Sequence, residues 1–195
     1  MSYADQASSS ATVTNLEPLV VRTASTFQPV VGTWSFPRDA GLDVAGASRI
    51  TLINASTTDL RVRLDDVVAD LPGKDVLTLG LEAGRKQIVT FEAPNGGDAD
   101  GSFVLHDTIS DWRLDSPGDR QETPFQGPLG LVLVNHPSSA FTVQWLAGGG
   151  LRARVAPDEA IGSSFTDAEA RSMAVQGPNV GAGTAKGLYL GLLDD

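Results

Sequence analysis

The chain has 195 residues, a length that suits one domain with a sizeable core, and its formal net charge at pH 7 is −10. It contains no Cys, so disulfides, thiolate metal ligands and cysteine nucleophiles are excluded. The excess of carboxylates argues against direct binding of nucleic acid, because affinity for phosphates needs clustered Lys and Arg.

Residues 1–14 form a polar segment rich in Ser, Ala and Thr. This segment has neither the basic start nor the apolar run of a secretory signal peptide. We expect it to be a flexible N-terminal arm.

From there to residue 160, apolar and polar residues alternate in short runs. Leu60, Val62 and Leu64, for example, are separated by Arg61 and Arg63. This period of two is typical of antiparallel strands that bury one face. Turn residues, mainly Gly and Pro, separate the runs. The expected strands are Leu19–Thr23, Val30–Phe36, Arg49–Asn54, Leu60–Asp65, Leu77–Glu82, Gln87–Glu92, Ser102–His106, Leu129–Val134, Phe141–Trp145 and Leu151–Val155.

Two parts of this region depart from simple alternation. Thr108–Pro128 is long and polar, and it is expected to be a surface loop that exposes Trp112. Leu129–Val134 is apolar at successive positions and is expected to be the most buried strand.

The last part of the chain predicts a helix and a tail. Thr166 and Glu169 have the spacing of a capping box, which favours a short helix that begins there. The tail is rich in Gly and then apolar, and it has little internal means of burying its side chains. We expect removal of residues 187–195 to impair assembly more than folding.

Together these patterns predict an all-β protein, a single jelly-roll β-sandwich with one short C-terminal helix and extended termini. The expected divisions are an N-terminal arm at residues 1–14, the sandwich at 15–160, and the helix with a C-terminal arm at 161–195.

Catalytic chemistry is not evident in the sequence. The two histidines, His106 and His136, belong to no zinc-binding pattern. A cupin-type metal centre would need both of them, with Asp107 or Glu92 as a third ligand. No GxSxG nucleophile motif is present. We therefore assign no catalytic residue, cofactor or metal, and we expect no enzyme. Asn54 lies in a glycosylation sequon, and its use is left open.

The charged residues are strongly biased, because Asp far outnumbers Glu and Arg far outnumbers Lys. At molar salt the screening length is only about 3 Å, so a surface crowded with carboxylates repels itself little. In dilute buffer the same charge opposes the compact state. The bias therefore predicts a protein adapted to high salt.

The size, the start Met1-Ser2-Tyr3-Ala4-Asp5-Gln6, the charge bias and the strands from Leu19 to Val155 together resemble one known family. It is the smaller major capsid protein of haloarchaeal, internal-membrane-containing icosahedral viruses, the sphaerolipovirus-like group. The resemblance implies a single upright jelly roll in capsomers shared with a second, larger jelly-roll protein. It also implies an underlying viral membrane, and it transfers no catalytic residue.

The first hypothesis is therefore a structural subunit of an icosahedral virion shell, assembled in the host cytoplasm at high salt. Its expected partners are other copies and a second capsid protein, with the underlying viral membrane as a further expected neighbour. Its candidate inter-subunit contacts are the apolar residues of the tail and the long loop: Leu188, Tyr189, Leu190, Leu192, Leu193 and Trp112.

Two alternatives remain open. One is a glycan- or receptor-binding sandwich or a decoration protein of a virion, which would need an exposed row of aromatic side chains from Trp34, Trp112 and Trp145. The other is the cupin-type metalloenzyme.

Overall fold

The computed structural model describes residues 30–123, 125 and 129–191. These residues form sixteen strands and one single-turn helix, α1 (Asp167–Ala170). The first eight strands are β1 (Val30–Phe36), β2 (Gly41–Val44), β3 (Arg49–Asn54), β4 (Leu60–Leu64), β5 (Val67–Leu71), β6 (Val76–Gly80), β7 (Gln87–Glu92) and β8 (Ala99–His106). The other eight are β9 (Thr108–Leu114), β10 (Arg120–Glu122), β11 (Leu129–Asn135), β12 (Val143–Ala147), β13 (Gly150–Val155), β14 (Ala160–Phe165), β15 (Ala174–Gln176) and β16 (Ala185–Gly191).

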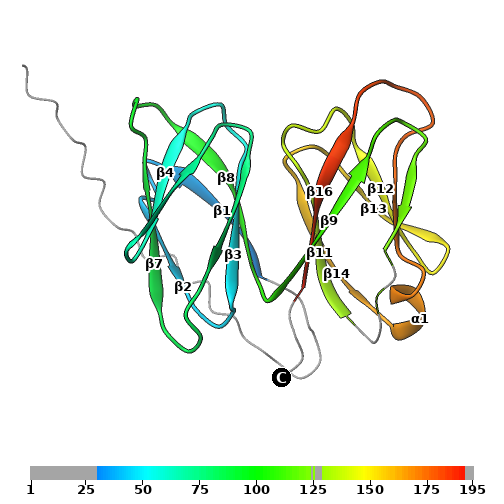
Figure 1. Ribbon diagram of the computed structural model, residues 1–195, viewed down its shortest axis with the longest axis horizontal. Helices are drawn as coiled ribbons and strands as arrows, with labels where there is room; N and C mark the ends of the chain where they lie inside the picture. The colour runs from blue at the N-terminus through cyan, green and yellow to red at the C-terminus, as the bar shows by residue number, and fades with distance from the viewer. Residues whose placement is uncertain (1–29, 124, 126–128, 192–195) are drawn as a thin grey trace, which may run out of the picture.

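The strands form two sandwiches that stand side by side (Figure 1). In the first half, the sheets have the strand orders β1-β8-β3-β6 and β2-β7-β4-β5. In the second half, the orders are β14-β11-β16-β9 and β10-β15-β12-β13. Adding eight to each strand number of the first half gives the strand order of the second. Each half is thus a complete eight-stranded jelly roll of antiparallel strands.

The predicted all-β sandwich fold is confirmed, but it is built twice within the chain. Residues 30–106 form the first jelly roll and residues 108–191 form the second. Alternation shows which face of a strand is buried but does not show which strands pair. The pattern along residues 15–160 therefore looked like one larger sandwich.

The predicted long loop and C-terminal arm require correction. The stretch expected as a surface loop contains β9 and β10, and residues 161–195 supply most of β14 and all of β15 and β16. Sequence reasoning missed β10 because it is short and β9 because it is largely polar, with Trp112 and Leu114 as its only buried residues. The apolar residues of β16 were instead interpreted as a tail. The expected strand Leu19–Thr23 and the N-terminal arm lie outside the described residues.

The apolar side chains collect in two separate cores, one in each jelly roll. Strand β11 separates the second core from the contact between the two halves. Leu131 and Leu133 point into the second core, whereas Val132 and Val134 point toward the first half. This explains why β11 is apolar on both faces, and residues 130–135 are all buried, as expected for one of the most buried strands.

The predicted capping box is present. Thr166 N–H donates to Glu169 Oε2 at 2.9 Å, and Glu169 N–H donates to Thr166 Oγ1 at 3.4 Å. The helix ends after one turn, with Arg171 as its C-cap, because the chain then returns to the sheet as β15. No helix among the described residues has the length and apolar character needed to cross a membrane.

The third strand of each half ends in a buried asparagine. Asn54 Nδ2 donates to the carbonyls of Thr58 and Pro72, at 2.8 and 3.0 Å. Asn135 Nδ2 donates to the carbonyls of Phe141 and Val155, at 3.0 and 2.9 Å. Each side chain thus holds the loops at one end of its jelly roll. Because Asn54 is fully buried, the glycosylation hypothesis is contradicted for the folded chain.

Candidate functional site

The two jelly rolls contact each other through the sheets β1-β8-β3-β6 and β14-β11-β16-β9, here called the inner sheets. The contact is mainly apolar, and β1 lies near β14 while β8 lies near β16. Its buried residues come from both halves: Ile53, Val104, Val132, Val134 and Leu190. Because this interface is built from strands in the middle of each inner sheet, it fixes the two halves against each other.

Polar side chains join the halves at one side of this interface. His136, in the loop after β11, donates from Nε2 to Asp75 Oδ1 at 2.9 Å. Its Nδ1 lies 3.1 Å from Ser138 N and 2.8 Å from Ser138 Oγ, and it accepts from the Ser138 N–H. Lys74 Nζ lies 3.5 Å from Asp158 Oδ2, again across the two halves.

The electrostatic surroundings keep the His136 imidazole neutral at pH 7. Burial lowers its pKa from the usual 6.5, and the charge of Lys186 lowers it further, although Asp75 opposes both effects. A neutral imidazole that accepts at Nδ1 carries its proton on Nε2, which is the atom that faces Asp75.

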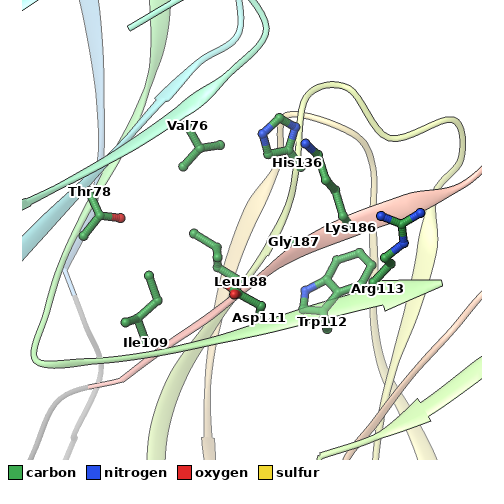
Figure 2. A pocket seen from close by; sticks show the side chains of 10 residues that line it. All are labelled: Val76, Thr78, Ile109, Asp111, Trp112, Arg113, His136, Lys186, Gly187 and Leu188. Atoms are coloured by element: carbon green, nitrogen blue, oxygen red, sulfur yellow. The ribbon is translucent and has the colours of Figure 1, made fainter. Parts of the chain in front are cut away.

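A pocket of about 390 Å³ opens beside these links, between β6 of the first half and β9 and β16 of the second (Figure 2). This volume lies within the range of small-molecule sites. Its walls combine apolar and charged side chains. The lining residues are Val76, Thr78, Ile109, Asp111, Trp112, Arg113, His136, Lys186, Gly187 and Leu188.

The charged residues of the pocket come from two paired strands. Arg113 on β9 lies directly opposite Lys186 on β16, and Asp111 lies directly opposite Leu188. Arg113 Nε donates to Asp115 Oδ1 at 2.7 Å. Within the described residues, neither Lys186 nor Asp111 has a side-chain ion pair. The pocket therefore holds one cation and one anion without a partner of opposite charge.

The other histidine, His106, belongs to a different network. Its Nε2 lies 2.8 Å from Thr51 Oγ1, and its Nδ1 lies 3.0 Å from the carbonyl of Thr108. Burial lowers the pKa of His106 to about 4, with a further lowering by Arg49. The described part of the chain contains no group of three or more His, Asp or Glu side chains placed to hold a metal ion. The proposed ligand set of His106, His136 and a carboxylate is therefore not assembled there.

The candidate inter-subunit contacts need correction, because three of them fill the chain's own interior. Trp112 and Tyr189 are buried in the second core, and Leu190 is buried between the halves. Leu188 is half-buried and lines the pocket. Leu192 and Leu193 lie outside the described residues.

The reason for this burial is the position of β16. The strand pairs with β11 on one side and with β9 on the other, so it is an internal strand of the second inner sheet. Removal of residues 187–191 would take away most of that strand. The expectation that truncation from residue 187 affects assembly more than folding is therefore wrong.

All three tryptophans are buried: Trp34, Trp112 and Trp145 are each 2% exposed or less. They pack inside the jelly rolls, where Trp34 stacks on Phe91 and Trp145 lies against Phe165. The exposed aromatic row that a glycan-binding surface would need is thus not formed by these residues.

Sequence reasoning missed most of the pocket. It singled out His136, Leu188 and Trp112, but not Asp111, Arg113 or Lys186. It also missed Asp75, which binds His136 beside the pocket. The run His136-Pro137-Ser138 directly after an apolar strand was the one available signal of a polar loop. The sequence around Asp111, Arg113 and Lys186 contains no such signal. These residues reach the pocket only because β9 and β16 pair with each other.

Comparison with known proteins identifies no family for this chain. No protein-family description matches it, and no curated protein matches it. Similar solved structures exist. The protein YhaK from Escherichia coli is 9% identical, with a TM-score of 0.52 and with 84% of each chain covered. This similarity concerns the fold alone.

Two further structures are similar at lower TM-scores. A cupin 2 conserved barrel domain protein from Leptotrichia buccalis is 10% identical, with a TM-score of 0.48, and 85% of this chain and 84% of that chain are covered. A turret protein of Sulfolobus turreted icosahedral virus is also 10% identical, with a TM-score of 0.29, and 86% of this chain and all of that chain are covered. Cupin-barrel and viral proteins thus both occur among the similar structures.

Proposed function

We propose that this chain is a structural subunit of a virion shell, which works by packing and not by catalysis. The observation that carries the proposal is the filling of both jelly-roll interiors with apolar side chains. In the first half these include Trp34, Leu42 and Phe103, and in the second half they include Trp145 and Phe165.

A filled interior favours a structural role because jelly rolls that act on small molecules use the space between their sheets. Here that space holds a cluster of buried apolar side chains in each half. The buried asparagines, Asn54 and Asn135, bond to main-chain carbonyls of their own loops. These polar groups therefore support the fold and are not available for chemistry.

The outer sheets offer surfaces for lateral contacts. Strands β5 and β13 are the corresponding edge strands of the two outer sheets, and each carries exposed apolar side chains. Val67, Val68 and Leu151 are about half exposed. Unpaired edge strands with apolar side chains readily add a strand from a neighbour. We assign contacts with other copies or with a second capsid protein to these edges, in place of the buried tail residues.

The remaining parts of the proposal rest on composition and on the resemblance. They comprise an icosahedral virion of an archaeal host, assembly in the host cytoplasm at high salt and an underlying membrane. The net charge of −10 supports the salt-adapted part. No enzyme activity, cofactor or contact with nucleic acid belongs to the proposal.

Cryo-electron microscopy of particles from the native source, combined with mass spectrometry of their proteins, tests this role. We expect the chain in many copies within an ordered shell. Recovery of the chain only as a soluble monomer, outside any particle, would overturn the proposal.

A variant pair tests the edge contacts. Val68→Lys combined with Leu151→Lys is expected to prevent assembly and to leave the unfolding midpoint unchanged. Val180→Lys is the matched control, because Val180 is 82% exposed but lies outside both edge strands. Normal assembly of the double variant would assign the contacts elsewhere.

A further inference from the structure

The charges of the pocket are present in only one of the two jelly rolls. Trp34 corresponds to Trp112 and Gly101 corresponds to Gly187, since each pair has the same place in its half. The residues that correspond to Asp111, Arg113 and Lys186 are then Thr33, Ser35 and Asp100. Because the first half folds in the same way without these charges, the fold itself does not require them.

Lys186 stands apart from the other lysines of the chain. Lys74 lies 3.5 Å from Asp158, and Lys86 Nζ lies 2.8 Å from Asp43 Oδ2. Lys186 has no carboxylate within that range in the described part of the chain, and it faces Arg113 across the strand pair. Like charges directly opposite each other on a sheet are unfavourable. Arg113 already has Asp115 as a partner, so an anion placed between Lys186 and Arg113 would chiefly compensate the charge of Lys186.

Asp111 supplies the opposite charge one pair further along the same face. It lies diagonally from Lys186, with Leu188 opposite it. Diagonal side chains on paired strands begin about 7–8 Å apart, which leaves room for a small molecule with two charges. In Figure 2 the Lys186 side chain extends toward His136, away from Asp111.

Apart from Thr78 and His136, the other residues that line the pocket are apolar. Val76 from the first half and Ile109 and Leu188 from the second line it. Gly187 has no side chain, so the Trp112 indole lies directly beneath that part of the wall. A ligand that suits this site therefore carries a negative group, a positive group and an apolar body.

We propose that this pocket binds a free α-amino acid with an aliphatic side chain. The carboxylate lies between Lys186 and Arg113, and the ammonium group contacts Asp111. The side chain packs against Val76, Ile109 and Leu188. This binding site goes beyond the shell role and does not depend on it, because the pocket is formed within a single chain.

Isothermal titration calorimetry of the intact chain with four probes tests the proposal. L-leucine carries all three features, whereas 4-methylpentanoate lacks the ammonium group, 3-methylbutylamine lacks the carboxylate and L-serine lacks the apolar body. We expect leucine to bind at least tenfold more tightly than each of the others. Equal affinity for all four, or no heat with leucine at 20 mM, would overturn the proposal.

Two variants separate the charged contacts. Lys186→Met keeps an apolar stem without the charge. It should lower the affinity for leucine at least tenfold without changing the affinity for 3-methylbutylamine. Asp111→Asn should lower the affinity for leucine by a similar factor without changing the affinity for 4-methylpentanoate. Lys86→Met and Asp98→Asn are the matched controls, because both residues lie outside the pocket and outside the links between the two halves.

A third variant tests the location. Ile109→Trp adds a larger side chain at a position that is already 37% exposed. It should prevent the binding of every probe while the thermal midpoint of unfolding stays unchanged. Leucine binding that is unchanged in Ile109→Trp, or that falls equally in Lys86→Met and Lys186→Met, would place the ligand elsewhere and reject the assignment.

Discussion

Trp34 and Trp112 occupy equivalent positions in the two jelly rolls, and each lays its indole over a glycine of the neighbouring strand. Trp34 covers Gly101, and Trp112 covers Gly187. A Cβ at either glycine would also meet a main-chain carbonyl, from Ile53 in the first half and from Val134 in the second. The two halves thus repeat a packing detail as well as a topology.

The glycines beneath these indoles should tolerate no side chain. A Cβ at Gly101 would lie 2.6 Å from Cζ2 of Trp34, and one at Gly187 would lie 2.5 Å from Cζ2 of Trp112. We expect Gly101→Ala and Gly187→Ala each to lower the free energy of unfolding by about 2–3 kcal/mol, because the added atom overpacks a closed site. Gly80→Ala is the control, since its Cβ would meet nothing within 4 Å. Urea unfolding at constant high salt measures all three, and midpoints equal to the control would contradict the packing.

The buried asparagines allow a second comparison. Asn54 uses both ends of its amide, since Oδ1 also accepts from Ser56 N–H at 3.1 Å and from Ser56 Oγ at 2.7 Å. The Oδ1 atom of Asn135 is buried without a partner among the described residues. Asn54→Ala is therefore expected to cost about 2–3 kcal/mol and Asn135→Ala about 1 kcal/mol less. Chemical unfolding of the two variants measures the difference, and the reverse order would contradict the hydrogen-bond assignment.

The buried His106 should make the stability depend on pH. Its folded pKa of about 4 lies below the unfolded value of 6.5, so the unfolded chain binds the extra proton between these values. The free energy of unfolding then falls as the pH is lowered through 6.5. The loss from this group is about 2 kcal/mol between pH 7.5 and pH 5.

His106→Gln removes this titration and leaves the carboxylates in place, so the variant should lose about 2 kcal/mol less than the parent over that range. Unfolding curves at several pH values give the comparison. Parallel pH profiles for the parent and His106→Gln would show that His106 does not titrate abnormally.

The surface charge predicts a dependence on salt. With a net charge of −10, the folded chain repels itself when the salt is lowered from molar levels to about 0.1 M. We expect the thermal midpoint, followed by circular dichroism, to fall over that range. Asp66→Asn with Asp98→Asn removes two exposed charges and should reduce the slope. A flat response of the parent protein would count against adaptation to high salt.

The sequence by itself determined the residues that form many of the strands. Gln87–Glu92 and Arg49–Asn54 were predicted with the bounds that the structure has, because alternation along a half-buried strand is a local property. The capping box at Thr166 was equally local. The charge bias and the lack of Cys are set by composition alone.

Only the tertiary structure showed the duplication and the pocket. Strand pairing joins residues far apart in the chain, such as Arg113 with Lys186 and Val134 with Leu188, and no local pattern records these partners. The apolar run at residues 188–190 is compatible with a tail that binds another subunit and equally with an internal strand. In the structure it is an internal strand, because β16 pairs with both β9 and β11. Hydrophobic burial fixes the inward face of a strand, whereas the three-dimensional packing fixes the core that it enters.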